Sequence, residues 1–375
     1  MNITKSALLS FIFTCFLFTS VYSQYDHSFF DAEKYDRVID SSHISFHFDN
    51  LNYFRNTEYT TRVDKGSTFP GFHLLPYVQY QFNEDAEIMG GLFLRYDFGN
   101  PQIRTIEPYI KFKYRLWGHD LIFGNLEGSV QHNLIEPMMD YEQSVTKRME
   151  QGIQVIRENK RIEYDFWIDW AQMIYQDDPK NEEMYAGLTL NLNPVLNEKT
   201  KLSLNGQGIT VHQAGEIDLS VHPNSVIYNY AFGLRLDHKF SKNTAIHLAG
   251  HATFFHDLSD FTPFKYRNGK GYLAVARLKL HDYHIVMSYW DGYQYQAPYG
   301  ERLYFSEGRK NVGDPYQNRE MVSFRIASEL HVAKNLTFLS RVGMNYNIDF
   351  QKADVIMENY LRWHFSTTPK KVSLN

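Results

Sequence analysis

From His43 to Phe365, apolar and polar residues alternate over one segment after another. In 161–170, for example, Tyr164 and Phe166 alternate with Glu163 and Asp165. Successive side chains of a β-strand point to opposite faces, so this alternation predicts strands, and helical spacing is nowhere sustained. The pattern predicts about 16 strands, within a range of about 14 to 18. They cover 43–59, 69–82, 87–98, 106–117, 120–132, 149–157, 161–170, 183–193, 200–213, 226–240, 244–255, 272–281, 283–293, 321–332, 336–350 and 355–365.

The links between these segments alternate in length. Short links follow the even strands, at 83–86, 118–119, 158–160, 194–199, 241–243, 282 and 333–335. Longer links generally follow the odd strands, at 60–68, 133–148, 176–182, 214–225, 256–270 and 294–318. An even-stranded up-and-down barrel with short periplasmic turns and long extracellular loops produces this parity. A sandwich with Greek-key crossings is not expected to keep it.

The two faces of the predicted sheet differ sharply in polarity. One face carries so many charged side chains that it cannot be buried in a dry core. A barrel of about 16 strands has a lumen too wide for side chains to pack, so the apolar face must look outward into lipid. The fold class is therefore all-β, a transmembrane antiparallel up-and-down barrel. Outward aromatics near strand ends suit interfacial girdles or are simply strand-forming residues: Phe82, Phe98, Trp170, Tyr228, Trp363 and Phe365.

The N-terminus predicts export. Lys5 precedes an apolar stretch, and small or tolerable residues precede a cleavage site near Ser23, so residues 1–23 are predicted to be a signal peptide. The single cysteine, Cys15, falls inside that stretch. Residues 24–42 are predicted to be a periplasmic segment, 43–365 the barrel and 366–375 a C-terminal tail. Loss of Lys5 leaves 37 Lys and Arg against 43 Asp and Glu, a mild acidity that points away from nucleic acid.

Composition agrees with a barrel once it is divided between two faces. The mean hydropathy of −0.45 and the 22% of charged residues exclude a helical membrane protein. A barrel strand needs only every second residue to be apolar, so its sequence averages to polar. The same numbers therefore remain compatible with a chain that lies in a membrane.

At this point the sequence resembles the porin-like outer-membrane β-barrels of Gram-negative bacteria. The resemblance covers most of 43–365 and includes the final segment 360–365, which ends in an aromatic residue as such barrels usually do. It implies contact with outer-membrane lipid and with the barrel-assembly machinery, and it allows a homotrimer. The tail beyond Phe365 departs from the pattern and makes a strictly C-terminal assembly signal less expected.

Motifs for enzyme chemistry are largely absent. The chain has no H-E-x-x-H, no G-x-S-x-G, no phosphate-binding loop and no cysteine cluster. His247 and His251 share a strand face but stand about 13 Å apart, too far for shared metal ligation. The sequence therefore predicts no enzyme, no catalytic residue, no metal site and no cofactor.

Charged residues on the lumen face are the stronger functional signal. Arg95, Lys111, Lys113 and Arg115 form a basic wall on two early strands, and Glu163, Asp165 and Asp169 form an acidic wall on one strand further round. Opposed walls in a wet pore create a field that selects solutes. Alternatively, these charges only hydrate the lumen and pair with neighbours. Later strands add Arg277, Lys279, Arg325 and Arg341 to the lumen set.

Two long links invite separate hypotheses. By the porin resemblance, the link 133–148 folds inward and places Glu136, Asp140 and Glu142 at a constriction, although it could equally stay outside. The link 294–318 mixes aromatic and charged residues, which suits a lid over the barrel mouth or, less often, contact with surface sugars.

These observations favour a porin-like channel for passive diffusion of small hydrophilic solutes, with selectivity set by the opposed walls. One alternative is a non-conducting or export barrel in envelope assembly or adhesion. A less favoured alternative is an outer-membrane barrel enzyme.

Overall fold

The computed structural model describes residues 28–30, 42–127, 132–215, 220, 224–262, 264–308, 316–367 and 370–371. The predicted signal peptide 1–23 lies outside these residues, as do most of the N-terminal segment 24–42 and most of the tail 366–375. In the part of the chain that is described, no helix has the length and apolar character needed to cross a membrane.

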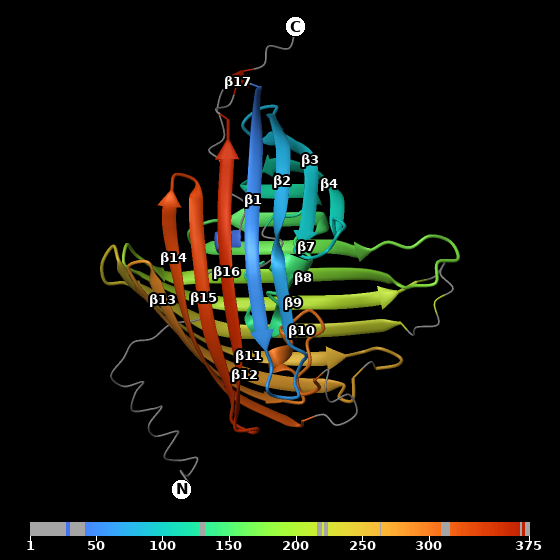
Figure 1. Ribbon diagram of the computed structural model, residues 1–375, viewed down its shortest axis with the longest axis vertical. Helices are drawn as coiled ribbons and strands as arrows, with labels where there is room; N and C mark the ends of the chain where they lie inside the picture. The colour runs from blue at the N-terminus through green and yellow to red at the C-terminus, as the bar shows by residue number, and fades with distance from the viewer. Residues whose placement is uncertain are drawn as a thin grey trace.

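Sixteen antiparallel strands close into a barrel, as the alternation predicts (Figure 1). β1 pairs with both β2 and β16, so the sheet has no free edge, and the two-residue β17 (Lys370–Lys371) adds to the start of β1. Closure satisfies the backbone polar groups that an open edge would expose to lipid. The strands are β1 (His43–Glu58), β2 (Ser67–Gln81), β3 (Ala86–Asp97), β4 (Thr105–Leu116), β5 (His119–Asn125), β6 (Gln151–Glu158), β7 (Ile162–Gln172), β8 (Glu182–Leu196), β9 (Thr200–Ala214), β10 (Ser225–Lys239), β11 (Thr244–Asp257), β12 (Asn268–Leu280), β13 (Tyr283–Tyr293), β14 (Asn318–Ala333), β15 (Leu336–Asn347) and β16 (Lys352–Ser366).

The two ends of the barrel differ in the length of their links. The β4–β5 turn is the tightest kind, with Trp117 at φ 52° and Gly118 at φ 75°. Positive φ at both central residues is the signature of a type I′ hairpin turn, whose twist matches that of the strands. At the opposite end, longer links join β1 to β2, β5 to β6 and β13 to β14. The long-link end is therefore the end that the parity rule predicts to be extracellular.

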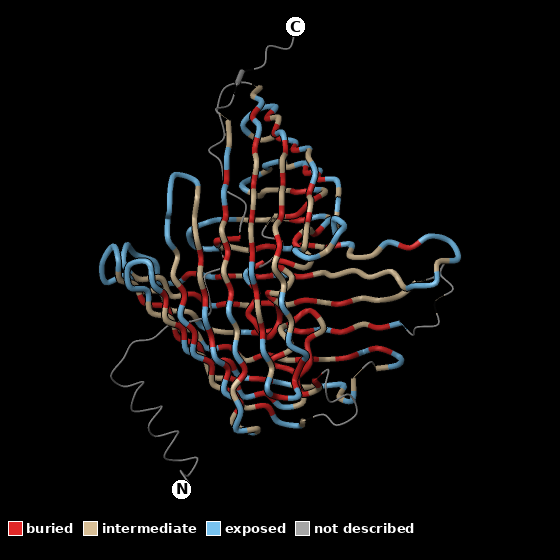
Figure 2. The backbone as a smooth tube through the Cα atoms, in the orientation of Figure 1, coloured by how far each residue is buried: buried red, intermediate tan, exposed pale blue. Residues whose placement is uncertain are grey.

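Burial alternates along the strands, which separates a lumen face from an outer face (Figure 2). On β1, Leu51 and Tyr53 are buried toward the lumen, whereas Phe46 and Phe54 on the other face are exposed. Phe232 on β10 is likewise exposed on the outer face, where a barrel meets lipid. The apolar face therefore looks outward, as predicted.

Loops, and not only wall side chains, fill the lumen. The β5–β6 link carries the short helices η2 (Glu136–Met138) and α2 (Gln143–Thr146), and the β13–β14 link carries η3 (Arg302–Tyr304). We refer to residues 132–150 and 294–308 as the plug loops. Their apolar side chains join the main buried cluster: Met138, Met139, Val145, Tyr295, Leu303 and Tyr304. The short helix η1 (Ser28–Phe30) packs there as well, with Phe30 against Tyr360 of β16.

Candidate functional site

The first plug loop spans the lumen between opposite walls. The Ile135 backbone N–H donates to Gln207 of β9 at 2.9 Å. Near the other end of the loop, Arg95 of β3 donates to the Thr146 carbonyl at 2.7 Å. β3 and β9 lie well apart around the sheet, so the loop crosses the interior and does not hug one wall.

The two plug loops are fastened to each other and to the wall. The Asp140 N–H donates to the Tyr299 carbonyl at 2.9 Å, and the Glu301 N–H donates to the Glu136 carbonyl at 3.1 Å. The Glu136 carboxylate is ion-paired with Arg325 of β14. This buried pair fixes the loops because either charge left alone would be costly.

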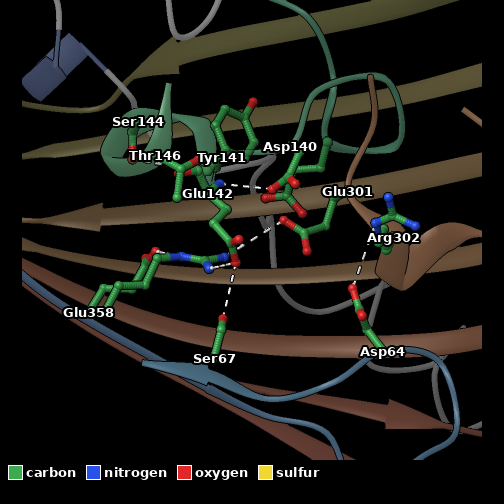
Figure 3. Close-up of polar contacts among 12 residues, drawn as sticks. Asp64, Ser67, Asp140, Tyr141, Glu142, Ser144, Thr146, Glu301, Arg302 and Glu358 are labelled. Carbon is green, nitrogen blue, oxygen red and sulfur yellow. Dashed lines mark hydrogen bonds and ion pairs between the residues drawn. The ribbon is translucent and has the colours of Figure 1, made fainter. Parts of the chain in front are cut away.

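Arg55 gathers carboxylates from both plug loops and from the wall. Figure 3 labels these carboxylates, Glu142, Glu301 and Glu358. Arg55 lies on the lumen face of β1, is 1% exposed, and contacts Glu142 at 2.7 Å, Glu358 of β16 at 3.1 Å and Glu301 at 3.9 Å. Asp140 completes the group, since one of its carboxylate oxygens accepts from the Glu142 N–H at 2.8 Å. We call Arg55, Asp140, Glu142, Glu301 and Glu358 the Arg55 cluster.

A serine hydroxyl points into this cluster from the first residue of β2. Ser67 Oγ donates to Glu142 Oε2 at 3.1 Å, and the same carboxylate oxygen accepts from Arg55. The Glu142 side chain is 29% exposed, in contrast to the buried Arg55 and Glu358. Glu142 of the cluster, with the half-buried Ser67 beside it, is thus the part of the site that an incoming molecule can reach.

Two carboxyl groups of the cluster hold protons unusually tightly. Burial raises the pKa of Asp140, and the neighbouring Glu142 charge raises it further. Burial and the nearby Asp140 raise the pKa of Glu301 well above its ordinary value. Buried carboxyl groups this close share a proton because two adjacent charges in a low dielectric are unfavourable. The arrangement can therefore supply or accept a proton at a plug-loop surface.

This proton affinity predicts a pH-dependent stability. Because the folded pKa of Glu301 is raised, the folded state binds the proton more tightly than the unfolded state. Stability is then highest at acidic pH and declines as pH rises through the folded pKa. We expect Glu301→Gln to flatten this decline in urea unfolding measured in detergent micelles from mildly acidic to mildly alkaline buffer. Glu84→Gln, in the exposed β2–β3 turn, is the control, and an unchanged slope in Glu301→Gln would contradict the shared proton.

The predicted basic wall consists of locally paired side chains. Arg95 bonds Asp97, two residues away on the same strand. The β4 residues pair with acids of β5 and of the link that follows it. These pairs are Lys111 with Glu127 at 3.7 Å, Lys113 with Glu127 at 3.0 Å and with Asp120 at 3.1 Å, and Arg115 with Asp120 at 2.7 Å.

The predicted acidic wall is paired in the same way. Glu163 contacts Lys201 of β9 at 2.7 Å, and Asp169 contacts Lys147 of the plug loop at 3.3 Å. Asp165 contacts the ring of His132 at 2.8 Å.

His132 is a buried cation between two acids. Burial alone lowers its pKa, but Asp165 and Glu150 together raise the pKa of His132 to about 10. Its ring stacks on Trp167 at 3.7 Å between centroids. With both ring nitrogens held by carboxylates, His132 anchors the loop to β7 and is not available as a base.

The later predicted lumen residues lie in different surroundings. Arg325 holds Glu136, and Arg341 stands 3.8 Å from Glu358. Arg277 is half-buried, and Lys279 is exposed near the short-turn end. Of these four residues, Arg325 reaches a plug loop and Arg341 approaches the Arg55 cluster.

The three predicted constriction residues all lie inside the barrel, and two of them, Asp140 and Glu142, belong to the Arg55 cluster. The sequence did not single out Arg55, Ser67, Glu301 or Glu358 as site residues. Alternation places Arg55 on the same face as Tyr53, a signal that could have found it. Among the described residues, no group of three or more His, Cys, Asp or Glu side chains is arranged to hold a metal ion.

Solved structures with the same architecture are outer-membrane proteins. A loop L8 deletion mutant of OmpT from Vibrio cholerae aligns with a TM-score of 0.53 and 9% identity, covering 87% of this chain and all of its own. The anion-selective porin from Comamonas acidovorans aligns with a TM-score of 0.51 and 8% identity, over 87% of this chain and all of its own. No curated protein matches the chain. The fold is that of an outer-membrane β-barrel.

A family model described as lipid A 3'-O-deacylase-type matches residues 32–372. Since the match spans most of the chain, the protein belongs to the lipid A 3'-O-deacylase-type family.

This membership corrects two predictions. The prediction of a porin-like channel for small hydrophilic solutes is wrong, and so is the prediction that the protein is not an enzyme, because the family is one of outer-membrane hydrolases. The channel prediction rested on the charged lumen face. That face does not distinguish the two cases, because a plugged barrel needs a wet inner face as much as an open pore does. Buried Met138 and Met139 stand where an open pore would hold water.

Proposed function

We propose that the protein is an outer-membrane ester hydrolase that releases an acyl chain from lipid A. The observation that carries this proposal is the lipid A 3'-O-deacylase-type match over residues 32–372. The plugged lumen supports it, because an enzyme needs a rigid scaffold for its side chains and not an open channel.

Accessibility supports Ser67 and Glu142 as the reacting pair. Ester hydrolysis needs a nucleophile beside a base. Thr61 with Asp354 is a comparable pair at 2.8 Å, but these two residues are 3% and 0% exposed. Ser45 with His47, at 2.7 Å, is also buried, in the half of β1 nearer the short-turn end. Ser67 lies at the long-link end, the side predicted to face the outer leaflet in which lipid A resides.

In the proposed reaction, Glu142 removes the proton of Ser67 as Oγ attacks the ester carbonyl carbon. The bond between that carbon and the sugar oxygen then breaks, and Glu142 returns the proton to the sugar oxygen. Water next attacks the acyl-serine ester, with Glu142 again as base, which releases the fatty acid and restores the serine. Arg55 holds Glu142 in place, and the Asp140 and Glu301 pair buffers protons beside it.

Mass spectrometry tests the proposal directly. Purified protein in detergent micelles, incubated with lipid A, is expected to release one fatty acid per molecule and to lower the lipid mass accordingly. A diacyl phospholipid of similar chain length is the substrate control. Lipid A that keeps its mass under all tested conditions would exclude the proposed activity.

A further inference from the structure

Five polar side chains form a band on the outer, lipid-facing side of the barrel around its closure. Asn50 and Asn52 point outward from β1. They alternate with Asp49, Leu51 and Tyr53, which point into the lumen. Asn359 of β16 is in register with Ser340 of β15, which is in register with Ser328 of β14. We call Asn50, Asn52, Asn359, Ser340 and Ser328 the outer polar band.

The band lies within the apolar surface and not at its border. On each of the four strands, the outward residue two positions before the band residues and the one two positions after them are apolar. They are Phe48 and Phe54 on β1, Met357 and Leu361 on β16, Phe338 and Val342 on β15, and Ile326 and Leu330 on β14. The band therefore sits at a depth that these neighbours mark as hydrocarbon.

Local hydrogen bonds satisfy the band only in part. Asn52 Nδ2 donates to Asn50 Oδ1 at 2.7 Å, and Asn50 Nδ2 donates to a β2 carbonyl at 3.1 Å. Ser340 Oγ donates to Asn359 Oδ1 at 3.0 Å. Within the described residues, Asn52 Oδ1, Asn359 Nδ2 and Ser328 Oγ have no hydrogen-bond partner. Lipid tails offer none, so each of these groups carries a desolvation penalty.

Two strands outside this face, β10 and β4, carry no comparable band. The outward residues along the middle of β10 are Tyr228, Tyr230, Phe232 and Leu234, and all are exposed. The outward residues of β4 are Ile106, Pro108, Ile110 and Phe112. Compared with β4 and β10, the face formed by β14, β15, β16 and β1 is thus the one with polar side chains at mid-depth.

We propose that the outer polar band is an interface at which a second copy of this chain pairs within the membrane. A partner must reach hydrocarbon depth and present donors and acceptors there. A second copy meets both conditions, because it sits at the same depth and carries the same amides and hydroxyls. A two-fold arrangement brings the band of one copy against the band of the other. This pairing satisfies the groups that lipid leaves unsatisfied.

Cysteine cross-linking in membranes tests this interface. Cys15 is the only cysteine in the sequence, so Asn359→Cys or Ser340→Cys in a Cys15→Ser chain introduces one thiol. We expect a short bismaleimide to produce a band of twice the chain mass from each variant. Phe232→Cys, exposed on β10, is the matched control and is expected to give at least about tenfold less dimer. Equal cross-linking of all three variants, or cross-links to another protein in place of a dimer, would overturn the proposal.

A second variant separates pairing from folding. Asn52→Leu with Asn359→Leu replaces the amides by residues that suit lipid, so the barrel is expected to remain folded. In sedimentation in detergent, the double variant is expected to run as a monomer at concentrations at which the parent chain is dimeric. Heat-modifiable gel mobility, which reports the closed barrel, is expected to be unchanged. A parent chain that is monomeric in both membranes and detergent contradicts the proposed interface.

Discussion

Ser67→Ala is expected to lower the rate of acyl release from lipid A by about a thousandfold or more, because it removes the proposed nucleophile. Glu142→Gln keeps the size of the side chain and its hydrogen-bond acceptor but removes the base, with an expected loss of about 10² to 10⁴-fold. The two residues act on the same proton. The double variant is therefore expected to be little slower than the slower single variant. Acyl release is measured as fatty acid formed per unit time at saturating lipid A.

Thr68→Ala is the matched control for Ser67→Ala. Thr68 is the next residue of β2, but its hydroxyl lies on the other face and donates to Asn56 Oδ1 at 2.6 Å. We expect activity within about twofold of the parent chain because surface substitutions of this kind perturb folding little. Equal activity of Ser67→Ala and the parent chain would exclude Ser67 as the nucleophile while leaving the family assignment intact.

The barrel was predictable from sequence because its rules are local. Alternation and link length each act over a few residues, and together they placed all 16 strands. The main boundary error is at the fifth strand, which was expected to reach residue 132 but ends at Asn125. There the chain leaves the wall, and Leu126 and Leu134 turn into the lumen core. A pattern of period two cannot distinguish apolar residues of a plug loop from apolar residues of a strand.

The site was only partly predictable because its contacts are not local. Glu142 meets Arg55 across 87 positions in the chain, and Glu358 meets it across 303. The porin resemblance indicated Asp140 and Glu142 on an inward-folding β5–β6 link, but nothing in the sequence showed that the β13–β14 link would bring Glu301 to them. Only closure of the barrel, with both links folded inward, creates the cluster.

The porin interpretation failed for a related physical reason. Lys111 and Lys113 were expected to face solutes, but acidic side chains of the same part of the wall neutralise them. A pore field needs charges that remain exposed to the lumen water. In this barrel the pairing alternative describes those lysines better, and within the Arg55 cluster the most exposed charge is Glu142.

Arg55→Met is expected to produce the largest loss of stability among single substitutions in the cluster. It leaves Glu142, Glu301 and Glu358 without their shared cation in a buried site, and breaking a buried ion pair typically costs about 3–5 kcal/mol. Arg115→Met is the control, because Arg115 is half exposed to solvent and its pair with Asp120 contributes at most about 1 kcal/mol. The free energy of unfolding is measured by urea titration of each variant folded in detergent micelles. Part of the loss in Arg55→Met should return at acidic pH, where the stranded carboxylates take up protons, and equal stability of both variants would show that the cluster does not hold the plug loops.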